Sequence, residues 1–225
     1  MIWAGLILIG LVAWAAICRW LLAGPRGDVE AGLAWRFLRL YARVVHRLRV
    51  EGEEHLPGGR SPGPLVVVMN HTAGVDPLLV QAACWFEIRF VMATDMRHPA
   101  GEWFWRWARV IFVDRIKGEA TGAREAIRHL ADGGVLGIFP EGGIERPRGV
   151  LMPFQPGVGL ILSRSRAPVL GVTIGGTPDA RTAWGSLVRP SRSVVRFHPI
   201  YKPSDGLSAK ELAAELEARF REWLR

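Results

Sequence analysis

Residues 65–77 read LVVVMNHTAGVDP, and this stretch determines how the rest of the chain is interpreted. Its first part, Leu65–Met69, is a continuous apolar run, which is typical of a strand buried on both faces of a parallel sheet. His71 follows the predicted strand, and Asp76 comes five residues later. On an ideal helix, positions five apart are turned about 140 degrees from one another, so these side chains must meet across a turn, which Gly74 allows.

The combination of His71 and Asp76 predicts a general base and the carboxylate that orients it. Asp76-Pro77 is a strong helix start, with Asp expected at the N-cap and Pro at the first helical position. A carboxylate there can accept from one imidazole nitrogen, which fixes the tautomer and leaves the other nitrogen to take a proton. Taken separately, the two residues have alternative interpretations, as a structural histidine and a plain helix cap.

Apolar strand patterns and helical patterns alternate from Pro64 onward. We expect strands at Leu65–Met69, Ile88–Ala93, Val110–Val113, Val135–Phe139, Val169–Ile174 and Val194–Phe197. We expect helices at Pro77–Phe86, Gly101–Ala108, Ala120–Leu130, Pro156–Ser165 and Ser208–Leu224. The order predicts an α/β domain over residues 51–225, with a mostly parallel sheet flanked by helices, and a ligand site beyond the carboxyl ends of the strands.

Two more predicted strands end in polar residues suited to substrate binding. Arg115 follows one strand and suits a phosphate or carboxylate, although an ion pair with Asp114 or Glu119 is the simpler alternative. Glu141 follows another and is placed to accept from a substrate hydroxyl, with a loop-stabilising role as the alternative. No Gly-x-Ser-x-Gly elbow lies near His71, so we expect the nucleophile to be a hydroxyl of the substrate.

The composition predicts an anionic partner and a reducing compartment. Lys and Arg number 29 against 21 Asp and Glu, which gives a formal charge of +8. Phospholipid headgroups, phosphorylated substrates and nucleic acid all fit that sign. Cys18 and Cys84 are the two cysteines, which argues against a disulfide framework, and no Cys/His cluster with metal-ligand spacing is visible.

The first 23 residues predict an uncleaved membrane anchor. Ile2–Cys18 carries no charge over 17 residues, and the apolar character continues past Arg19 to Leu22. Basic residues follow the segment, so the positive-inside bias places the remainder of the chain in the cytoplasm, on an inner membrane. A helix that lies half-inserted in the interface is the alternative.

Residues 28–50 predict a basic amphipathic helix that lies on an anionic leaflet. Attraction to such a surface amounts to roughly 1 kcal/mol per basic residue near the headgroups. An ordinary solvated helix face is the alternative, whereas nucleic acid is not expected as a partner because no motif for it appears. The basic positions are Arg36, Arg39, Arg43 and Arg47, and the apolar stripe is Leu33, Phe37, Leu40, Val44 and Leu48.

An aromatic run, Trp103-Phe104-Trp105-Arg106-Trp107, falls in a predicted helix. Tryptophan is enriched at lipid interfaces, so one interpretation is contact with a membrane. Alternate spacing does not make a helical stripe, and ordinary core packing is the other interpretation.

Four sequence blocks follow one another along the chain: Asn70–Asp76, Phe112–Arg115, Phe139–Gly142 and Ala167–Val172. In that order they resemble the blocks of the 1-acylglycerol-3-phosphate acyltransferase family of glycerolipid acyltransferases. The resemblance implies that His71 deprotonates an acceptor hydroxyl, which attacks the thioester of an acyl carrier protein or coenzyme A donor. It implies that Asp76 orients the histidine and that Asn70, Arg115, Glu141 and Gly142 hold the lysolipid acceptor, with no metal or organic cofactor.

One departure from the family pattern concerns the acceptor. Family members commonly have an arginine, implicated in phosphate binding, where this chain has Ile144. Either Arg146 or Arg148 replaces it, or the acceptor is another lysolipid, such as a lyso-ornithine lipid. A phospholipid transacylase, a hydrolase in which water replaces the acceptor, and a catalytically silent lipid-binding module remain alternatives.

Overall fold

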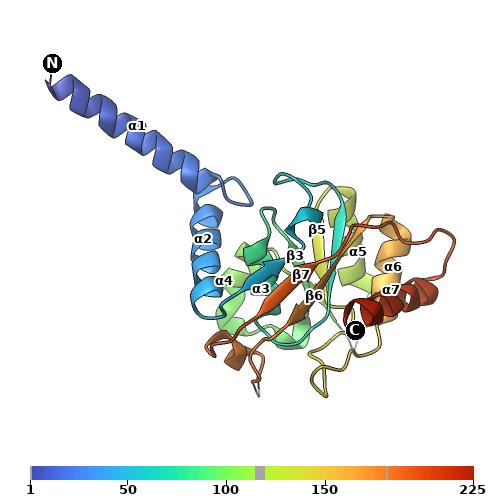
Figure 1. Cartoon of the computed structure of the whole chain (residues 1–225). Helices are drawn as coiled ribbons and strands as arrows, with labels where there is room; N and C mark the ends of the chain where they lie inside the picture. Colours follow the sequence, from blue (N-terminus) through green and yellow to red (C-terminus); the bar gives the residue numbers. More distant parts are fainter. Residues whose placement is uncertain (1, 115–119, 181) are drawn as a thin grey trace.

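The computed structural model describes residues 2–114, 120–180 and 182–225. Its centre is a seven-stranded sheet in the order β1-β7-β6-β2-β5-β3-β4, with α1 projecting away from the rest of the chain (Figure 1). Strands β6, β2, β5, β3 and β4 are mutually parallel, whereas β7 pairs antiparallel with β6 and parallel with β1. The strands are β1 (Arg49–Glu51), β2 (Leu65–Met69), β3 (Arg89–Ala93), β4 (Ile111–Val113), β5 (Val135–Ile138), β6 (Val169–Gly175) and β7 (Val194–Phe197).

The helices in the described residues are α1 (Ile2–Leu22), α2 (Val29–Val44), α3 (Asp76–Ala83), α4 (Glu102–Trp107), α5 (Ala120–Ala131), α6 (Pro156–Ser165) and α7 (Ala209–Trp223). Of these, α2 and α3 pack on one face of the sheet, and α5, α6 and α7 pack on the other. Short 3-10 turns are η1 (Glu53–His55), η2 (Thr94–Met96), η3 (Pro99–Gly101) and η4 (Trp184–Leu187). The predicted fold class is confirmed, and each strand and helix predicted for the domain is present with its ends shifted by a few residues at most.

Strand β2 is the centre of the fold because both of its faces are buried. Leu65, Val67 and Met69 pack into one core with residues of α2 and α3, whereas Val66 and Val68 pack into the other with residues of α5, α6 and α7. Burial of an aliphatic side chain contributes roughly 1.5–3 kcal/mol, so this strand alone favours folding strongly. The residues that follow β2 therefore begin between its two neighbouring strands, β5 and β6, at the carboxyl end of β2.

The predicted helix over residues 28–50 is too long, and this boundary is corrected by the structure. Helix α2 ends at Val44, Arg47 adopts a left-handed conformation with φ 45°, and Arg49–Glu51 is strand β1. The buried His46 causes the break, because its ring contacts the hydroxyls of Tyr41 and Ser191, both at 2.8 Å. The contact with Ser191 joins residues 145 positions apart in the sequence, so local pattern does not reveal it.

Helices α1 and α2 meet at a joint made of glycines. A Cβ added at Gly32 would lie 1.7 Å from the carbonyl oxygen of Leu21, and one at Gly24 would lie 2.5 Å from the Cα of Gly32. The Asp28 carboxylate caps α2 by accepting from the N–H of Ala31 at 2.7 Å. The angle between the two N-terminal helices is therefore set by backbone contact that larger side chains would prevent.

A buried histidine makes the fold sensitive to acid. His198 stacks on Trp223 at 4.2 Å between ring centroids, and its Nε2 lies 3.0 Å from the Thr173 hydroxyl. Burial lowers the pKa of His198 from 6.5 to about 4, and the charge of Arg196 acts in the same direction. The folded pKa is depressed, so the unfolded chain takes up the proton first and stability is lost as the pH falls from 6.5 towards 4.

We predict that His198→Phe, which keeps a ring against Trp223, flattens this pH dependence. The wild-type free energy of unfolding should lose about 2 kcal/mol more than the variant's between pH 7 and pH 4.5. Urea unfolding in detergent at both pH values measures the difference. His98→Phe, at an exposed histidine, is the control and should keep the wild-type dependence; equal slopes in wild type and His198→Phe would contradict the assignment.

Candidate active site

The His71 and Asp76 side chains meet where β2 runs into α3. The Nδ1 of His71 lies 3.0 Å from the Oδ2 of Asp76, and Phe139 stacks on the imidazole at 4.1 Å between centroids. The Asp76 side chain is 0% exposed, whereas the histidine retains access to solvent. The two residues therefore meet across the turn, as their spacing requires, with the aspartate behind the histidine.

The Asp76 carboxylate holds the whole turn. Its Oδ2 accepts from the backbone N–H groups of Thr72 at 2.6 Å and Ala73 at 2.8 Å, and its Oδ1 accepts from the Thr72 hydroxyl at 3.1 Å. The predicted N-cap position is wrong by one residue, because Val75 is the N-cap and Asp76 is the first residue of α3. The carboxylate points back at the turn because the N–H donors of residues 72 and 73 lie there.

This geometry determines which nitrogen of His71 is available. An ionised carboxylate only accepts hydrogen bonds, so Nδ1 carries the proton and Nε2 has the free lone pair. Asp76 also stabilises the positive charge that arises when Nε2 takes a proton. The arrangement can therefore remove a proton from a hydroxyl placed against Nε2 and return it in a later step.

The loop after β5 holds the backbone of His71 on both sides. Glu141 accepts from the His71 N–H at 2.7 Å through Oε1 and from the Met152 N–H at 2.8 Å through Oε2. The N–H of Glu145 donates to the His71 carbonyl at 2.8 Å, and the Oε1 of Glu145 accepts from the Gly149 N–H at 2.7 Å. Burial raises the pKa of Glu141, whereas the two N–H donors act in the opposite direction. The observed contacts of Glu141 stabilise the loop, and contact with a substrate hydroxyl stays a prediction.

Two other predicted binding residues shape the backbone around the dyad. Asn70 is buried and pairs with the main chain of Ile174, donating to its carbonyl at 3.0 Å and accepting from its N–H at 2.8 Å. This pair continues the β2–β6 ladder past the end of β2. Gly142 adopts φ 73°, a conformation that favours glycine, at the turn after β5. Both residues contribute to the architecture of the site, and their contact with an acceptor stays a prediction.

A small cavity lies beside the turn between His71 and Asp76 and is lined by the predicted basic residues Arg146 and Arg148. Thr72, Gly74, Ile144, Arg146 and Arg148 line it, together with residues of the loop after β6. The Arg146 side chain is exposed and donates to the carbonyl of Glu145 at 3.1 Å. Ile144 and both arginines thus lie next to the dyad, as expected if they form the acceptor side of the site. Arg115 lies outside the described residues.

The arginine at position 148 is already engaged by the loop after β6. It donates to the carbonyl of Thr177, contacts the Thr177 hydroxyl at 3.2 Å and lies 3.7 Å from a carboxylate oxygen of Asp179. The hydroxyls of Thr177 and Thr72 lie 2.8 Å apart, so a chain of contacts runs from Arg148 to Asp76. Sequence reasoning missed Thr72 and Thr177; Thr72 lies within the His-Asp block, whereas no local signal marks Thr177.

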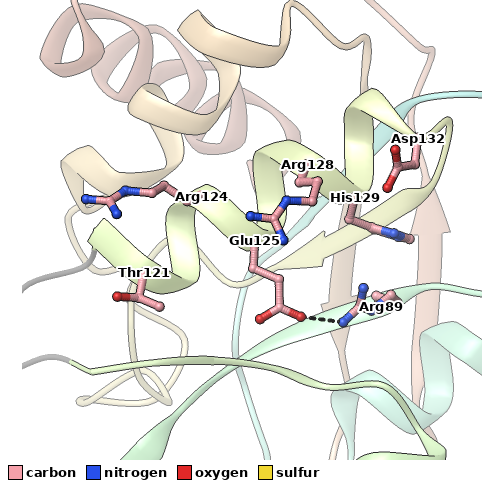
Figure 2. Close-up of a pocket in the computed structure, with 7 residues that line it drawn as sticks. All are labelled: Arg89, Thr121, Arg124, Glu125, Arg128, His129 and Asp132. Carbon is pink, nitrogen blue, oxygen red and sulfur yellow. Dashed lines mark hydrogen bonds and ion pairs between the residues drawn. The ribbon is translucent and has the colours of Figure 1, made fainter.

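A second groove in the described part of the chain lies away from the dyad. It has a volume of about 340 Å³ and is lined by Arg89 and one face of α5, including Arg124, Glu125 and Arg128 (Figure 2). Arg89 pairs with Glu125 at 2.7 Å. Arg89 begins β3 level with the start of β2, so the part of the groove beside Arg89 lies at the opposite end of the sheet from His71. Within residues 2–114, 120–180 and 182–225, no group of three His, Cys, Asp or Glu is placed to hold a metal ion.

We predict that Glu141→Gln destabilises the loop far more than Glu145→Gln does. Both oxygens of Glu141 accept from backbone N–H groups, so an amide nitrogen must face a donor, at a cost of about 1–3 kcal/mol. Glu145 accepts through one oxygen in the contacts observed, and an amide can keep that contact. Thermal unfolding in detergent checks the difference, and equal melting temperatures of the two variants would contradict the role assigned to the two Glu141 contacts.

Comparisons with known proteins identify the family of this chain and support its fold. A family model described as Acyltransferase matches residues 47–175, which is more than half of the chain and includes the dyad and the Glu141 loop. The fold is similar to the crystal structure of the 1-acyl-sn-glycerophosphate (LPA) acyltransferase PlsC from Thermotoga maritima, with a TM-score of 0.68 and 22% sequence identity. That match covers 88% of this chain and 81% of the other. A comparison with curated protein sequences gave no match.

The solved structure supports the fold, and the family model identifies the kind of enzyme. The matched region begins before β1 and ends at the last residue of β6, so it contains the strands that precede His71 and Glu141. We conclude that the chain belongs to the Acyltransferase family and is an acyltransferase.

Proposed function

We propose that this enzyme is attached to a membrane and transfers an acyl chain from a thioester to the hydroxyl of a lysolipid, with lysophosphatidic acid as the leading acceptor. The donor is an acyl carrier protein or coenzyme A thioester. The observation that carries the proposal is the 3.0 Å contact between His71 Nδ1 and the fully buried Asp76, which leaves Nε2 free to act as a base.

The proposed reaction is a single acyl transfer. Nε2 of His71 takes the proton of the acceptor hydroxyl while the hydroxyl oxygen attacks the thioester carbonyl carbon. The C–O bond forms, the C–S bond breaks, and the imidazolium returns the proton to the departing thiolate. Asp76 stabilises the imidazolium between these steps. Proton transfer through His71 accounts for every proton moved in this reaction, so the proposed step uses no cofactor.

The proposed acceptor side is the small cavity beside the turn. The solved relative is described as an LPA acyltransferase, so a phosphate monoester is the natural headgroup to consider. Arg146, with its exposed guanidinium, is the group we assign to that phosphate, with Arg148 as a second contact. Ile144 supplies no charge, so in this proposal the contact with the phosphate depends more strongly on Arg146 than it would if position 144 were an arginine. We retain Arg115, Asn70, Glu141 and Gly142 as acceptor-side residues of the proposal.

The proposed attachment uses both N-terminal helices. Helix α1 is long and apolar enough to cross a membrane by length and composition, and none of its apolar window is buried by the rest of the chain. Helix α2 leaves an apolar stripe exposed beside basic residues, with Phe37 70% exposed. An exposed apolar stripe on a helix that follows such a segment suits a lipid interface. The basic residues after α1 favour a catalytic domain on the cytoplasmic side of the inner membrane.

We predict that His71→Ala lowers kcat about 10²- to 10⁴-fold, which is the usual contribution of a general base. Asp76→Asn should lower it as well, because the amide cannot accept from the same donors. The assay is transfer of a labelled acyl group from a thioester to a panel of lysolipids in detergent. Undiminished transfer by His71→Ala would refute the mechanism. If the wild type consumes thioester without forming an acylated lipid, a hydrolase would be favoured. If it consumes no thioester and forms no acylated lipid, a catalytically silent lipid-binding module would be favoured.

We predict that Arg146→Gln raises the KM for lysophosphatidic acid about tenfold, because a charge-assisted contact with the phosphate is lost. The KM for a lysolipid without a phosphate monoester, such as a lyso-ornithine lipid, should change little. Arg128→Gln, in the α5 groove at the other end of the sheet, is the matched control. An equal effect on all acceptors, or a preference of the wild type for lyso-ornithine lipid, would contradict this assignment.

A further inference from the structure

Three exposed apolar side chains lie on neighbouring segments that the proposed reaction does not use. Trp103 on α4 is 69% exposed, Trp184 on η4 is 48% exposed, and Val188 just after η4 is 80% exposed. We call these three residues the apolar rim. Large apolar side chains at such exposure are unfavourable in water unless they have a partner.

The two segments of the rim are packed against each other. Trp105 of α4 is buried and contacts Trp184 at 5.9 Å between ring centroids. The indole N–H of Trp105 donates to the carbonyl of His98 at 3.1 Å, which holds the ring in place. The aromatic run over residues 103–107 is therefore divided, with Trp105 in the packed interior and Trp103 directed to the surface. Core packing is confirmed for Trp105, whereas lipid contact stays a prediction for Trp103.

The rim adjoins the end of α2, where the exposed stripe of that helix finishes. The Tyr41 hydroxyl donates to the carbonyl of Leu187 at 2.6 Å, next to Val188. The N–H of Ser191 donates to the carbonyl of Val45 at 3.2 Å. Figure 1 shows the loop after β6 beside the C-terminal end of α2. The apolar stripe of α2 ends at Val44, so stripe and rim belong to neighbouring parts of one region of the surface.

Positive charge accompanies each part of the rim. Arg106 is exposed on α4, and Arg189 and Arg192 are exposed in the loop that follows Val188. Exposed tryptophan with arginine is the composition of a membrane interface, because indole partitions to the headgroup region and guanidinium attracts anionic lipid. An acidic protein would match the charge, but it would not account for continuity with the apolar stripe of a helix that follows a candidate span.

We propose that the apolar rim is a second membrane contact, in which Trp103, Trp184 and Val188 enter the headgroup layer of an anionic phospholipid surface. The inference rests on the membrane attachment proposed for α1 and α2, and it adds a contact made by the catalytic domain itself. Each exposed side chain that enters the layer removes apolar area from water, so the three act together with the N-terminal helices.

The rim also lies against the catalytic turn. A Cβ added at Gly74 would lie 2.4 Å from the carbonyl oxygen of Ala183, so the segment that leads into η4 touches the loop between His71 and Asp76. A lipid surface at the rim is therefore close to the dyad. The lysolipid acceptor then passes from the bilayer to the site without crossing bulk water.

The test places spin labels on the full chain in vesicles of phosphatidylcholine and phosphatidylglycerol. Cys18→Ser supplies the background, because the remaining Cys84 is buried and does not react. Labels are attached through V188C at the rim, F37C on the α2 stripe and E222C on α7. Oxygen reports contact with lipid and a soluble nickel complex reports contact with water. We expect labels at 188 and 37 to be several-fold more accessible to oxygen relative to nickel than the label at 222.

The outcomes separate this inference from the proposal on which it rests. Lipid exposure at 37 with water exposure at 188 overturns the second contact and leaves the N-terminal attachment in place. Water exposure at both positions overturns both the second contact and the N-terminal attachment.

A kinetic experiment tests the delivery of the acceptor. Val188→Glu should raise the KM for lysolipid in vesicles about fivefold with kcat unchanged, and it should have no effect on the KM for a short-chain acceptor in detergent. Ile200→Glu, at an exposed apolar residue near the opposite end of β6, is the control. An unchanged KM for Val188→Glu in vesicles overturns delivery of acceptor at the rim.

Discussion

The site depends on one buried carboxylate. A carboxylate withdrawn from water is very unfavourable unless donors surround it, and Asp76 meets that requirement with the Nδ1 of His71, two backbone N–H groups and a hydroxyl. The same contacts that compensate for burial bend residues 72–75 into the turn and fix the histidine tautomer. The carboxylate that shapes the turn is therefore also the group that orients the proposed base.

The sheet provides the rigid frame for that turn. Strand β2 lies between β5 and β6 and has both faces buried, so its last residue has little freedom. The loop after β5 then binds the backbone N–H and carbonyl of His71, and Asn70 ties the end of β2 to β6. Three strand ends thus position one imidazole. Such support matters because a base is effective only when its nitrogen is held within hydrogen-bonding distance of the reacting proton.

The N-terminal helices and the apolar rim orient this frame towards lipid in our proposal. The end of α2 is connected to the segment that carries the rim through two hydrogen bonds, from the Tyr41 hydroxyl to the carbonyl of Leu187 and from the N–H of Ser191 to the carbonyl of Val45. The dyad lies behind the same segment, at the Gly74 turn. In the proposed enzyme, the membrane-facing surface and the hydroxyl-activating base therefore lie on adjacent loops.

Sequence alone determined the features that local physics controls. The uninterrupted apolar run of β2 predicted a buried parallel strand, and the five-residue spacing of His71 and Asp76 predicted a turn between them; both are observed. Only tertiary structure decided the end of α2, because His46 is drawn inward by Ser191, 145 residues away. It also gave Glu141 and Asn70 contacts with backbone groups of distant strands and loops, and it showed Trp105 buried beside an exposed Trp103. Those outcomes depend on which groups the fold brings together, and the type and spacing of residues along the chain do not identify partners that are distant in the sequence.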